Sequence, residues 1–464
     1  MISAPSRRLQ SNGSNQRQIA FVSILLLQFL LSACHSVSYP IQGEKKAPVK
    51  TAPNPKLPKV DTIQWTERKM DPQKSKASPL VRQVSKKSPT DPIFRIGILL
   101  PLSTTNLEDA DEELLNNNQR AIQFYAGVKI ALDSFKNSGA KLKVDVYDTQ
   151  ESDAAIAKIL DKPGMKNLDM LIGPYVSENV QTVGKFAKEN RIVLLSPWNT
   201  SPDLFTDNPY FIQMKAGLKA HCEVICTDIA SKYKATQVNI IVRNPQKDKS
   251  KLDYLHENFQ KLYGVKDAAK IKEVFVGETG ESIRSALNSE RMNSTDAMVF
   301  VVPHWSTETY VLFLLRTLNG ARKQNPTVVY GFPQWKNFNT IDPDLFDKLQ
   351  VQITNSNRTD QDPQNLLAFK RAFYQKYSAV PTDESIYGFD VMRYCMELIQ
   401  KHKYQFPEHL DYISSATLDN VFGPRIVIGP NGTAKSPETA YYENHQINWL
   451  QFHKKNFVPR DSIE

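Results

Sequence analysis

The chain has 464 residues, of which 41% are hydrophobic and 10% aromatic. This is enough for about two or three domains with sizeable cores, and it excludes a wholly disordered chain. The net charge of +9 is unevenly distributed: residues 1–34 hold three Arg and no acidic residue, and residues 35–93 hold twelve Lys or Arg against five Asp or Glu. The rest of the chain is close to neutral, so charge gives little support for nucleic-acid binding by the folded part.

The N-terminus predicts a lipoprotein signal peptide over residues 1–34. Three Arg precede an apolar run over 19–31, which has the length of a signal-peptide core and is short for a membrane span. The run ends in Leu31-Ser32-Ala33-Cys34, which resembles the bacterial lipobox. This resemblance implies that Cys34 receives diacylglycerol and becomes the mature N-terminus. An ordinary secretory signal with a chance Cys is the alternative.

A lipidated Cys34 places the protein in the cell envelope, anchored to a membrane and facing the periplasm, because several acyl chains on one residue hold a protein stably in a bilayer. The next residue is His35 rather than the Asp that resembles an inner-membrane retention signal in enteric bacteria. This favours the outer membrane and leaves the inner membrane open.

Residues 35–93 predict a disordered tether, because they are rich in Lys and Pro and show no periodic apolar pattern. Contact of the tether with anionic lipid or a wall polymer stays open beside a solvated spacer. The nine prolines are Pro40, Pro48, Pro53, Pro55, Pro58, Pro72, Pro79, Pro89 and Pro92.

The globular part begins with Ile96-Gly97-Ile98-Leu99-Leu100, an apolar run typical of a buried parallel strand. An acidic loop over 108–113 follows. Strands and helices then alternate, which predicts βαβ units and a parallel sheet. The first set comprises helices over 121–135 and 180–187 and strands over 142–147, 169–173 and 192–195.

A second set of βα units follows without a detectable sequence repeat, which predicts a second parallel sheet. Two further helices are expected over 369–377 and 386–401, and a hairpin after 424–428 with its turn at Gly429-Pro430-Asn431-Gly432. The second set comprises helices over 221–233, 252–262, 282–287 and 307–318 and strands over 238–242, 274–276, 297–302 and 327–330.

Several segments, in this order, resemble type I periplasmic binding proteins of the leucine/isoleucine/valine-binding branch, in a variant like that of Bacteroidetes lipoproteins. The similarity runs from about residue 96 to residue 452. It implies two Rossmann-like α/β lobes joined by hinge crossovers, with residues 94–213 plus 356–420 in the N-terminal lobe and 214–355 plus 421–464 in the C-terminal lobe. The segments are Ile96 to Leu102, Gly127 to Asp133, Ile172-Gly173-Pro174, Leu195 to Pro202 and Tyr387-Gly388-Phe389-Asp390.

This resemblance also implies where a ligand binds. The carboxylate of an amino-acid ligand would meet Ser177 and the residues around Asn199 and Thr200, with Ser103 as a further candidate. Ligands of parallel sheets sit beyond the carboxyl ends of the strands, and a helix N-terminus favours an anion. Helix N-capping by Ser177 and Thr200 is the equal alternative.

Aromatic residues at strand ends are candidates for the wall of the same site. His304 and Trp305 follow Pro303, and Trp335 follows Pro333. A structural role in the core is the alternative for Trp335. The family often has small residues where Trp198 stands, so Trp198 would fill the pocket or stack on a ring of the ligand.

The chemistry of an enzyme is not indicated. No acyl-transfer, zinc-protease or phosphate-loop motif occurs, and the eight His lack metal spacing. We expect no cofactor and no metal, and structural roles for the carboxylates of Asp148, Glu384 and Asp390. The remaining thiols, Cys222, Cys226 and Cys395, are expected to be buried.

The sequence therefore predicts a lipid-anchored solute-binding protein that closes on a small polar ligand, with an ABC permease as partner in import or a role in sensing. Free amino acids are doubtful ligands, because no acidic residue is placed to hold an ammonium group and the usual segment of the second lobe is replaced by residues 244–249. The alternative is an envelope interaction protein that regulates peptidoglycan synthesis, since lipoproteins that activate penicillin-binding proteins share this fold.

Overall fold

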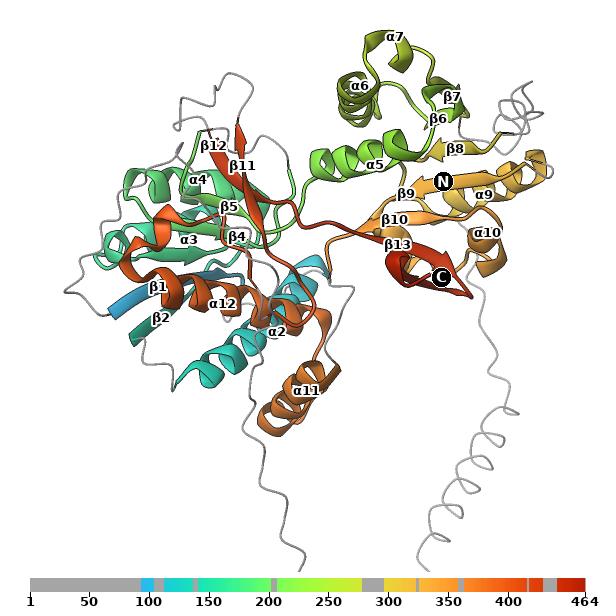
Figure 1. Ribbon diagram of the computed structural model, residues 1–464. Coiled ribbons are helices and arrows are strands. Elements are labelled where there is room, and N and C mark those ends of the chain that lie inside the picture. The colour runs from blue at the N-terminus through green and yellow to red at the C-terminus, as the bar shows by residue number, and fades with distance from the viewer. Residues whose placement is uncertain are drawn as a thin grey trace, which may run out of the picture. The chain divides into compact units, whose positions relative to one another are not determined.

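The structure is a computed structural model, drawn in Figure 1. The predicted signal peptide and the predicted tether lie outside the described part, apart from Ile93, which begins the first strand, as do the predicted helix over 282–287 and the predicted Asn431-Gly432 turn. The described residues are 93–103, 112–136, 141–201, 207–277, 296–322, 325–357, 363–414, 417–428 and 440–463.

The first lobe is built on a seven-stranded sheet in the order β11-β12-β5-β4-β3-β1-β2. All neighbouring pairs are parallel except β11–β12, which form an antiparallel hairpin. The strands are β1 (Ile93–Leu100), β2 (Lys141–Asp148), β3 (Met170–Ile172), β4 (Val193–Ser196), β5 (Phe211–Gln213), β11 (Pro424–Ile428) and β12 (Ala440–Asn444).

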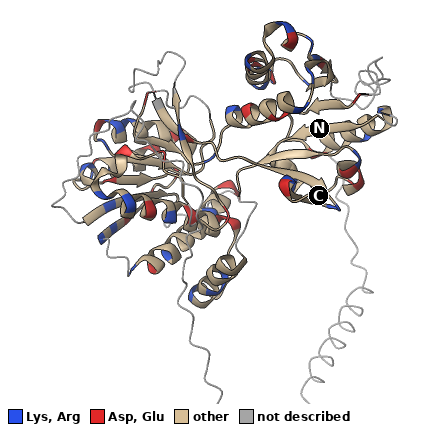
Figure 2. Ribbon diagram, viewed as in Figure 1, with Lys and Arg blue, Asp and Glu red and all other residues tan. Residues whose placement is uncertain are grey.

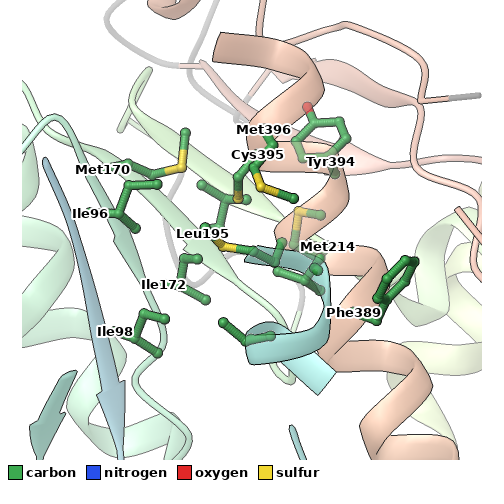
Figure 3. Packing of buried hydrophobic residues seen from close by; sticks show 14 of the residues in the cluster. Ile96, Ile98, Met170, Ile172, Leu195, Met214, Phe389, Tyr394, Cys395 and Met396 are labelled. Atoms are coloured by element: carbon green, nitrogen blue, oxygen red, sulfur yellow. The ribbon is translucent and has the colours of Figure 1, made fainter. Parts of the chain in front are cut away.

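Helices cover both faces of this sheet because the side chains of a buried strand alternate between two apolar layers. Ile96 and Ile98 of β1 face one layer, and Leu99 faces the other. Figure 3 shows the first layer, in which Phe389 and Met396 pack over the strands. This layer contains α2 (Glu112–Phe135), α11 (Pro363–Tyr377) and α12 (Asp383–His402), and the opposite layer contains α3 (Asp153–Leu160) and α4 (Ser177–Glu189).

The second lobe repeats this architecture in the order β14-β13-β10-β9-β8-β6-β7. Its five parallel strands follow the same order as the five of the first sheet, and β13 and β14 add an antiparallel edge. The strands are β6 (Val238–Val242), β7 (Lys272–Phe275), β8 (Met298–Val301), β9 (Thr327–Gly331), β10 (Gln352–Asn355), β13 (Asn448–His453) and β14 (Asn456–Pro459).

The helices of the second lobe also form two layers. One contains α5 and α6, and the other contains α9 and α10. Short 3-10 turns complete both lobes. The helices are α5 (Leu218–Lys232), α6 (Lys249–Tyr263), α7 (Val265–Ala268), α9 (Glu308–Ala321) and α10 (Pro343–Lys348), and the turns are η1 (Met165–Asn167), η2 (Ala235–Gln237), η4 (Pro333–Asn337), η5 (Lys403–Glu408) and η7 (Arg460–Ser462).

Two sequence-based assignments are corrected by the structure. The strands β11 and β12 do not belong to the second lobe, because β12 pairs in parallel with β5 and so extends the first sheet. Only β13 and β14 return to the second sheet. The acidic loop ends earlier than expected: α2 begins at Glu112, and Glu112 and Glu113 occupy its first turn, where the helix dipole favours negative charge.

Candidate functional site

In both lobes, groups of polar and aromatic side chains lie in and beside the loops that follow the carboxyl ends of the parallel strands. In each sheet the chain reverses its direction of winding between two adjacent strands, β1 and β3 in the first lobe and β6 and β8 in the second. Crevices beyond this point are where open parallel sheets bind ligands. We therefore built the candidate site from the loops that follow these strands.

The loop after β1 is held by Asp148, the last residue of β2. One carboxylate oxygen of Asp148 accepts the backbone N–H groups of Leu102, Ser103 and Gln150 at 2.9, 3.0 and 3.1 Å. Ser103 is buried and has a positive φ of 43°. Asp148 thus has a structural role, and Ser103 lies at the carboxyl edge of the sheet.

A group of five side chains, the first-lobe cluster, lies at this edge. Its members come from five separate segments. In the first-turn region of α12, Glu384 accepts from the guanidinium of Arg120 on α2, with Nε of Arg120 at 3.0 Å from Oε1 of Glu384. The cluster consists of Arg120, Tyr175, Trp198, Lys215 and Glu384.

Trp198 is the centre of the cluster. Its ring is half-buried and lies 4.6 Å from the ring of Phe124 and 4.7 Å from that of Tyr175, measured between centroids. Its Nε1–H donates to Oε2 of Glu384 at 3.4 Å. The guanidinium of Arg120 lies 5.6 Å from the ring centroid of Tyr175. The indole therefore packs in a tilted orientation against aromatic side chains of the first lobe itself and covers part of the edge.

Lys215 follows β5, on the chain segment that leads into the second lobe. Its ammonium lies 4.8 Å from the ring centroid of Tyr387, whose hydroxyl donates to the carbonyl of Pro197. Burial lowers the pKa of Lys215. The carboxylate of Glu384 opposes this decrease, and the positive charge of Arg120 lowers the pKa further. The side chain is thus a partly buried cation packed against an aromatic face.

The residues predicted to bind the carboxylate of a ligand, Ser177, Asn199 and Thr200, follow Tyr175 and Trp198 of this cluster in the chain and differ in burial. Asn199 is buried, and its Oδ1 accepts the backbone N–H of Ser201 at 2.6 Å. Ser177 is exposed and is the first residue of α4, but the N-cap is Val176 and no side chain caps the helix. N-capping by Ser177 is therefore wrong. Thr200 is exposed, and residues 202–206 lie outside the described part of the chain.

The second lobe has its own group, the second-lobe cluster, after β6 and β8. Asp248 accepts the backbone N–H groups of Arg243 and Asn244 at 3.1 and 3.0 Å, and Nζ of Lys251 lies 3.1 Å from its Oδ1. Burial raises the pKa of Asp248, but these donors and His304 outweigh it, so the pKa falls. The cluster consists of Asp248, Lys251, His304 and Trp305.

His304 and Trp305 occupy the predicted strand-end positions in this cluster. Nε2 of His304 lies 3.6 Å from Oδ2 of Asp248, and burial lowers the pKa of His304 to about 4. The imidazole is therefore neutral at neutral pH, and its contact with Asp248 is not an ion pair. The ammonium of Lys251 lies 4.6 Å from the ring centroid of Trp305, which is half-buried.

Trp335 is not part of either cluster. It is fully buried, and its Nε1–H donates to the carbonyl of His304 at 2.7 Å. Its ring stacks with Phe338 and Phe346. The prediction of Trp335 as a wall residue is wrong, and the alternative of a core residue is confirmed, because a side chain without exposed surface cannot contact a ligand.

Other ionisable groups have structural roles. Asp390 is fully buried and accepts from the backbone of Leu418, Asp419 and Asn420; burial raises its pKa to about 6, and these donors oppose the rise. Within the described ranges, no group of three or more His, Cys, Asp or Glu could hold a metal ion. No helix in the same ranges is long and apolar enough to cross a membrane.

Sequence reasoning missed four members of the first-lobe cluster as site residues: Arg120, Tyr175, Lys215 and Glu384. Glu384 had a weak signal, an acidic residue in the first turn of a predicted helix, and was expected to have a structural role. Arg120 and Lys215 had none, because only the packing of α2 against α12 and the course of the chain after β5 bring them to the same edge.

Comparisons with known proteins agree with this architecture. Residues 123–327 match the profile of a family described as receptor family ligand binding region. No curated protein sequence matches the chain. A structure from Rhodospirillum rubrum assigned to branched-chain amino acid ABC transport is 14% identical with a TM-score of 0.57, and the match covers 79% of this chain and 99% of that one.

Two further structures are similar to the chain. One is the periplasmic ligand-binding protein of a branched-chain amino acid ABC transporter from Burkholderia xenovorans, at 13% identity and a TM-score of 0.51, covering 80% of this chain and 92% of that one. The other is LpoA from Haemophilus influenzae, at 16% identity and a TM-score of 0.50, covering 79% of this chain and 59% of that one. At these identities the similarity establishes the fold.

Proposed function

We propose that this chain, which has the type I periplasmic binding protein fold, is a lipid-anchored, non-enzymatic protein of the cell envelope that binds a small polar ligand such as an amino acid or a related solute. The binding serves import through an ABC permease, or sensing. The fold alone supports a binding role without naming the ligand, because one fold serves many functions. The residues of the site must indicate which ligand is bound.

The first-lobe cluster is the observation that carries the proposal. It places a guanidinium, an ammonium, a carboxylate and an indole N–H at the carboxyl edge of a parallel sheet, beside the β1–β3 reversal. A few convergent polar groups on an aromatic base are typical of small-molecule sites. In the second lobe, Trp305 and Lys251 occupy the corresponding edge and offer a further surface to the same class of ligand.

Anchoring through Cys34 is part of the proposal and rests on the lipobox-like residues 31–34. A Cys34→Ala variant is expected to leave the membrane fraction of envelope preparations, and the unmodified protein is expected to incorporate labelled palmitate. Fractionation of the envelope decides between outer membrane, which His35 favours, and inner membrane. Recovery of Cys34→Ala in the membrane fraction after a high-salt wash would contradict lipid anchoring.

Ligand binding is tested by thermal denaturation of the full-length protein in detergent, with amino acids, short peptides, nucleobases and muropeptides added separately. One class is expected to raise the melting temperature by several degrees, because only binding to the native state stabilises it. The control is Lys249→Met on α6, an exposed side chain outside both clusters. A Trp198→Ala variant is expected to lose the response and Lys249→Met to keep it. The absence of a response to all four classes would contradict the proposal.

An interaction protein that regulates peptidoglycan synthesis is the second candidate. Trp198 favours it, because this indole is held by Phe124, Tyr175 and Glu384 and covers part of the carboxyl edge of the sheet. The similarity to LpoA is consistent with this candidate but shows the fold only. Crosslinking in cells to a peptidoglycan synthase, without any small-molecule response, would support this function over ligand binding.

A further inference from the structure

We infer that the ligand of the first-lobe cluster is a carboxylate-bearing anion, which takes the place of Glu384 on the guanidinium of Arg120 and pairs with the ammonium of Lys215. This inference deepens the proposed function and rests on it. It assigns a charge class to the ligand, and it assigns Glu384 the role of a built-in competitor rather than that of a recognition group.

The contacts of Glu384 are the first step. One oxygen of its carboxylate accepts from Nε of Arg120 at 3.0 Å and from Nη2, and the other accepts from Nε1 of Trp198 at 3.4 Å. A guanidinium and an indole N–H are donors only, so both can donate to the carboxylate of a ligand in place of Glu384, and the charge of the guanidinium favours an anion. The side chain of Glu384 is 17% exposed and that of Arg120 is 50% exposed, so solvent-borne ligands can reach the pair.

The charge of Lys215 is the second step. Within the described part of the chain its ammonium makes no ion pair, and the ring of Tyr387 is its contact. Glu384 and Arg120 are the two charged groups close enough to affect its pKa, and they are paired with each other. Glu151 lies near Tyr175, on which it acts together with Arg120 and Glu384. A partly buried cation whose neighbouring carboxylate, that of Glu384, is already paired with Arg120 favours an anionic ligand.

The direction of α12 is the third step. Thr382 caps this 20-residue helix, and Glu384 lies in its first turn, so the positive end of the helix dipole lies at the cluster. The dipole stabilises whichever carboxylate lies there, internal or external. A cationic ligand would meet Arg120, Lys215 and this helix end, and Glu384 would have to release Arg120 to receive it.

The test uses three five-carbon probes of similar length: glutarate, glutaramide and 1,5-diaminopentane, which carry two negative charges, no charge and two positive charges. Binding to the full-length protein is measured by calorimetry at constant ionic strength. Glutarate is expected to bind more tightly than the other two. Replacing Lys215 by Met is expected to weaken glutarate about tenfold, and Lys215→Arg is expected to retain it. The matched control is Lys219→Met, four residues further along the chain, which is expected to bind like the unmodified protein.

Glu384→Gln is the decisive variant, because it keeps the size of the side chain and removes the competing charge. If Glu384 competes with the ligand, this variant binds glutarate about tenfold more tightly. If Glu384 instead recognises a cation, the same variant loses 1,5-diaminopentane, and the inference is wrong. Melting curves of each variant show whether it is folded.

The remaining outcomes also bear on the inference. Equal affinity for all three probes, or no binding of glutarate at tens of millimolar, overturns the anionic ligand. The proposed function then still rests on the wider panel of four compound classes, in which a neutral or cationic compound could raise the melting temperature. Failure of the inference is thus separable from failure of the proposed function.

Discussion

Gly127 of α2 and Gly388 of α12 lie where the two helices touch backbone to backbone. A Cβ atom on Gly127 would stand 1.8 Å from the carbonyl oxygen of Ser385, and one on Gly388 would stand 2.0 Å from that of Phe124. The same crossing sets Arg120, two turns before Gly127, beside Glu384, one turn before Gly388. Close packing of two helices thus assembles the charged pair of the first-lobe cluster.

Replacing Gly127 by Ala is expected to destabilise the protein by about 3 kcal/mol, because the helices must separate to admit a methyl group. It is also expected to weaken the Arg120–Glu384 contact and with it ligand binding. The free energy of unfolding in urea measures the first effect. Gly320→Ala near the end of α9 is the control: nothing lies within 4 Å of its Cβ position, so it is expected to be neutral or slightly stabilising. Equal effects of both changes would contradict this account.

Arg460 is expected to hold the C-terminal residues on the second lobe. Its guanidinium forms a bidentate pair with Asp228, at 2.9 and 2.8 Å, and donates to Gln352; the hydroxyl of Tyr330 donates to the same carboxylate. Arg460→Met leaves Asp228, which is 9% exposed, without its main cation, so a loss of about 2 kcal/mol in unfolding free energy is expected.

Lys249→Met, which breaks an exposed pair with Asp253, is the control for Arg460→Met and is expected to change stability by less than about 0.5 kcal/mol. Burial raises the pKa of Asp228, but its donors, Arg460 foremost, outweigh this and lower it. The Arg460–Asp228 contribution is therefore present at neutral pH and is lost as the pH falls through the lowered pKa of Asp228. A contribution that grew in acid would contradict this pairing.

His221 is expected to make the protein less stable in acid. It lies at the start of α5, with Nδ1 at 2.9 Å from Oγ1 of Thr354, and burial, with His445 nearby, lowers its pKa to about 4. The unfolded chain takes up a proton on this group near pH 6.5, whereas the folded protein does so only near pH 4. Between these values the unfolded state binds more protons, so stability falls as the pH falls, by up to about 3 kcal/mol for this group.

The comparison of unmodified protein with His221→Gln isolates this group, since all other titrating groups are common to both. The difference in unfolding free energy is expected to favour the unmodified protein at neutral pH and to shrink by about 3 kcal/mol on acidification to near pH 4. A difference that stays constant with pH would show that His221 titrates alike in both states.

The three thiols of the folded part are expected to be inert. Cys222, Cys226 and Cys395 are buried and unpaired, as expected from the sequence, and burial raises the pKa of Cys222 to about 12. Since the thiolate is the reactive form, a thiol reagent is expected to modify none of them in the native protein and all three after unfolding. Counting modified thiols by mass spectrometry tests this, and rapid labelling of the native protein would contradict the burial.

The overall charge of the chain says little about what the folded part binds. Lys and Arg in Figure 2 are interspersed with Asp and Glu over the described elements, in line with the near-neutral folded part expected from the sequence. The charges that bear on ligand binding are those of a few side chains in the first-lobe cluster. The ammonium of Lys215, which makes no ion pair among the described residues, and the pair of Arg120 with Glu384 define the ligand that we infer, and this depends on the position of the charges rather than on their number.

The sequence by itself determined the α/β class with two parallel sheets, because short apolar runs that alternate with amphipathic helices are the local pattern of strands buried on both faces. It also placed Trp198, His304 and Trp305 at strand ends and left Cys222, Cys226 and Cys395 buried. Only the tertiary structure decided that β11 and β12 join the first sheet, since strand pairing across more than 200 residues leaves no local pattern.

Tertiary structure likewise decided which residues meet at the site. Arg120 and Glu384 are 264 residues apart, and contact between α2 and α12 brings them together because Gly127 and Gly388 have no side chains. Trp335 follows a strand like Trp305, yet its ring turns into the core, where its indole N–H finds the carbonyl of His304. Local periodicity sets which elements form, and packing at long range sets which side chains remain at the surface to bind.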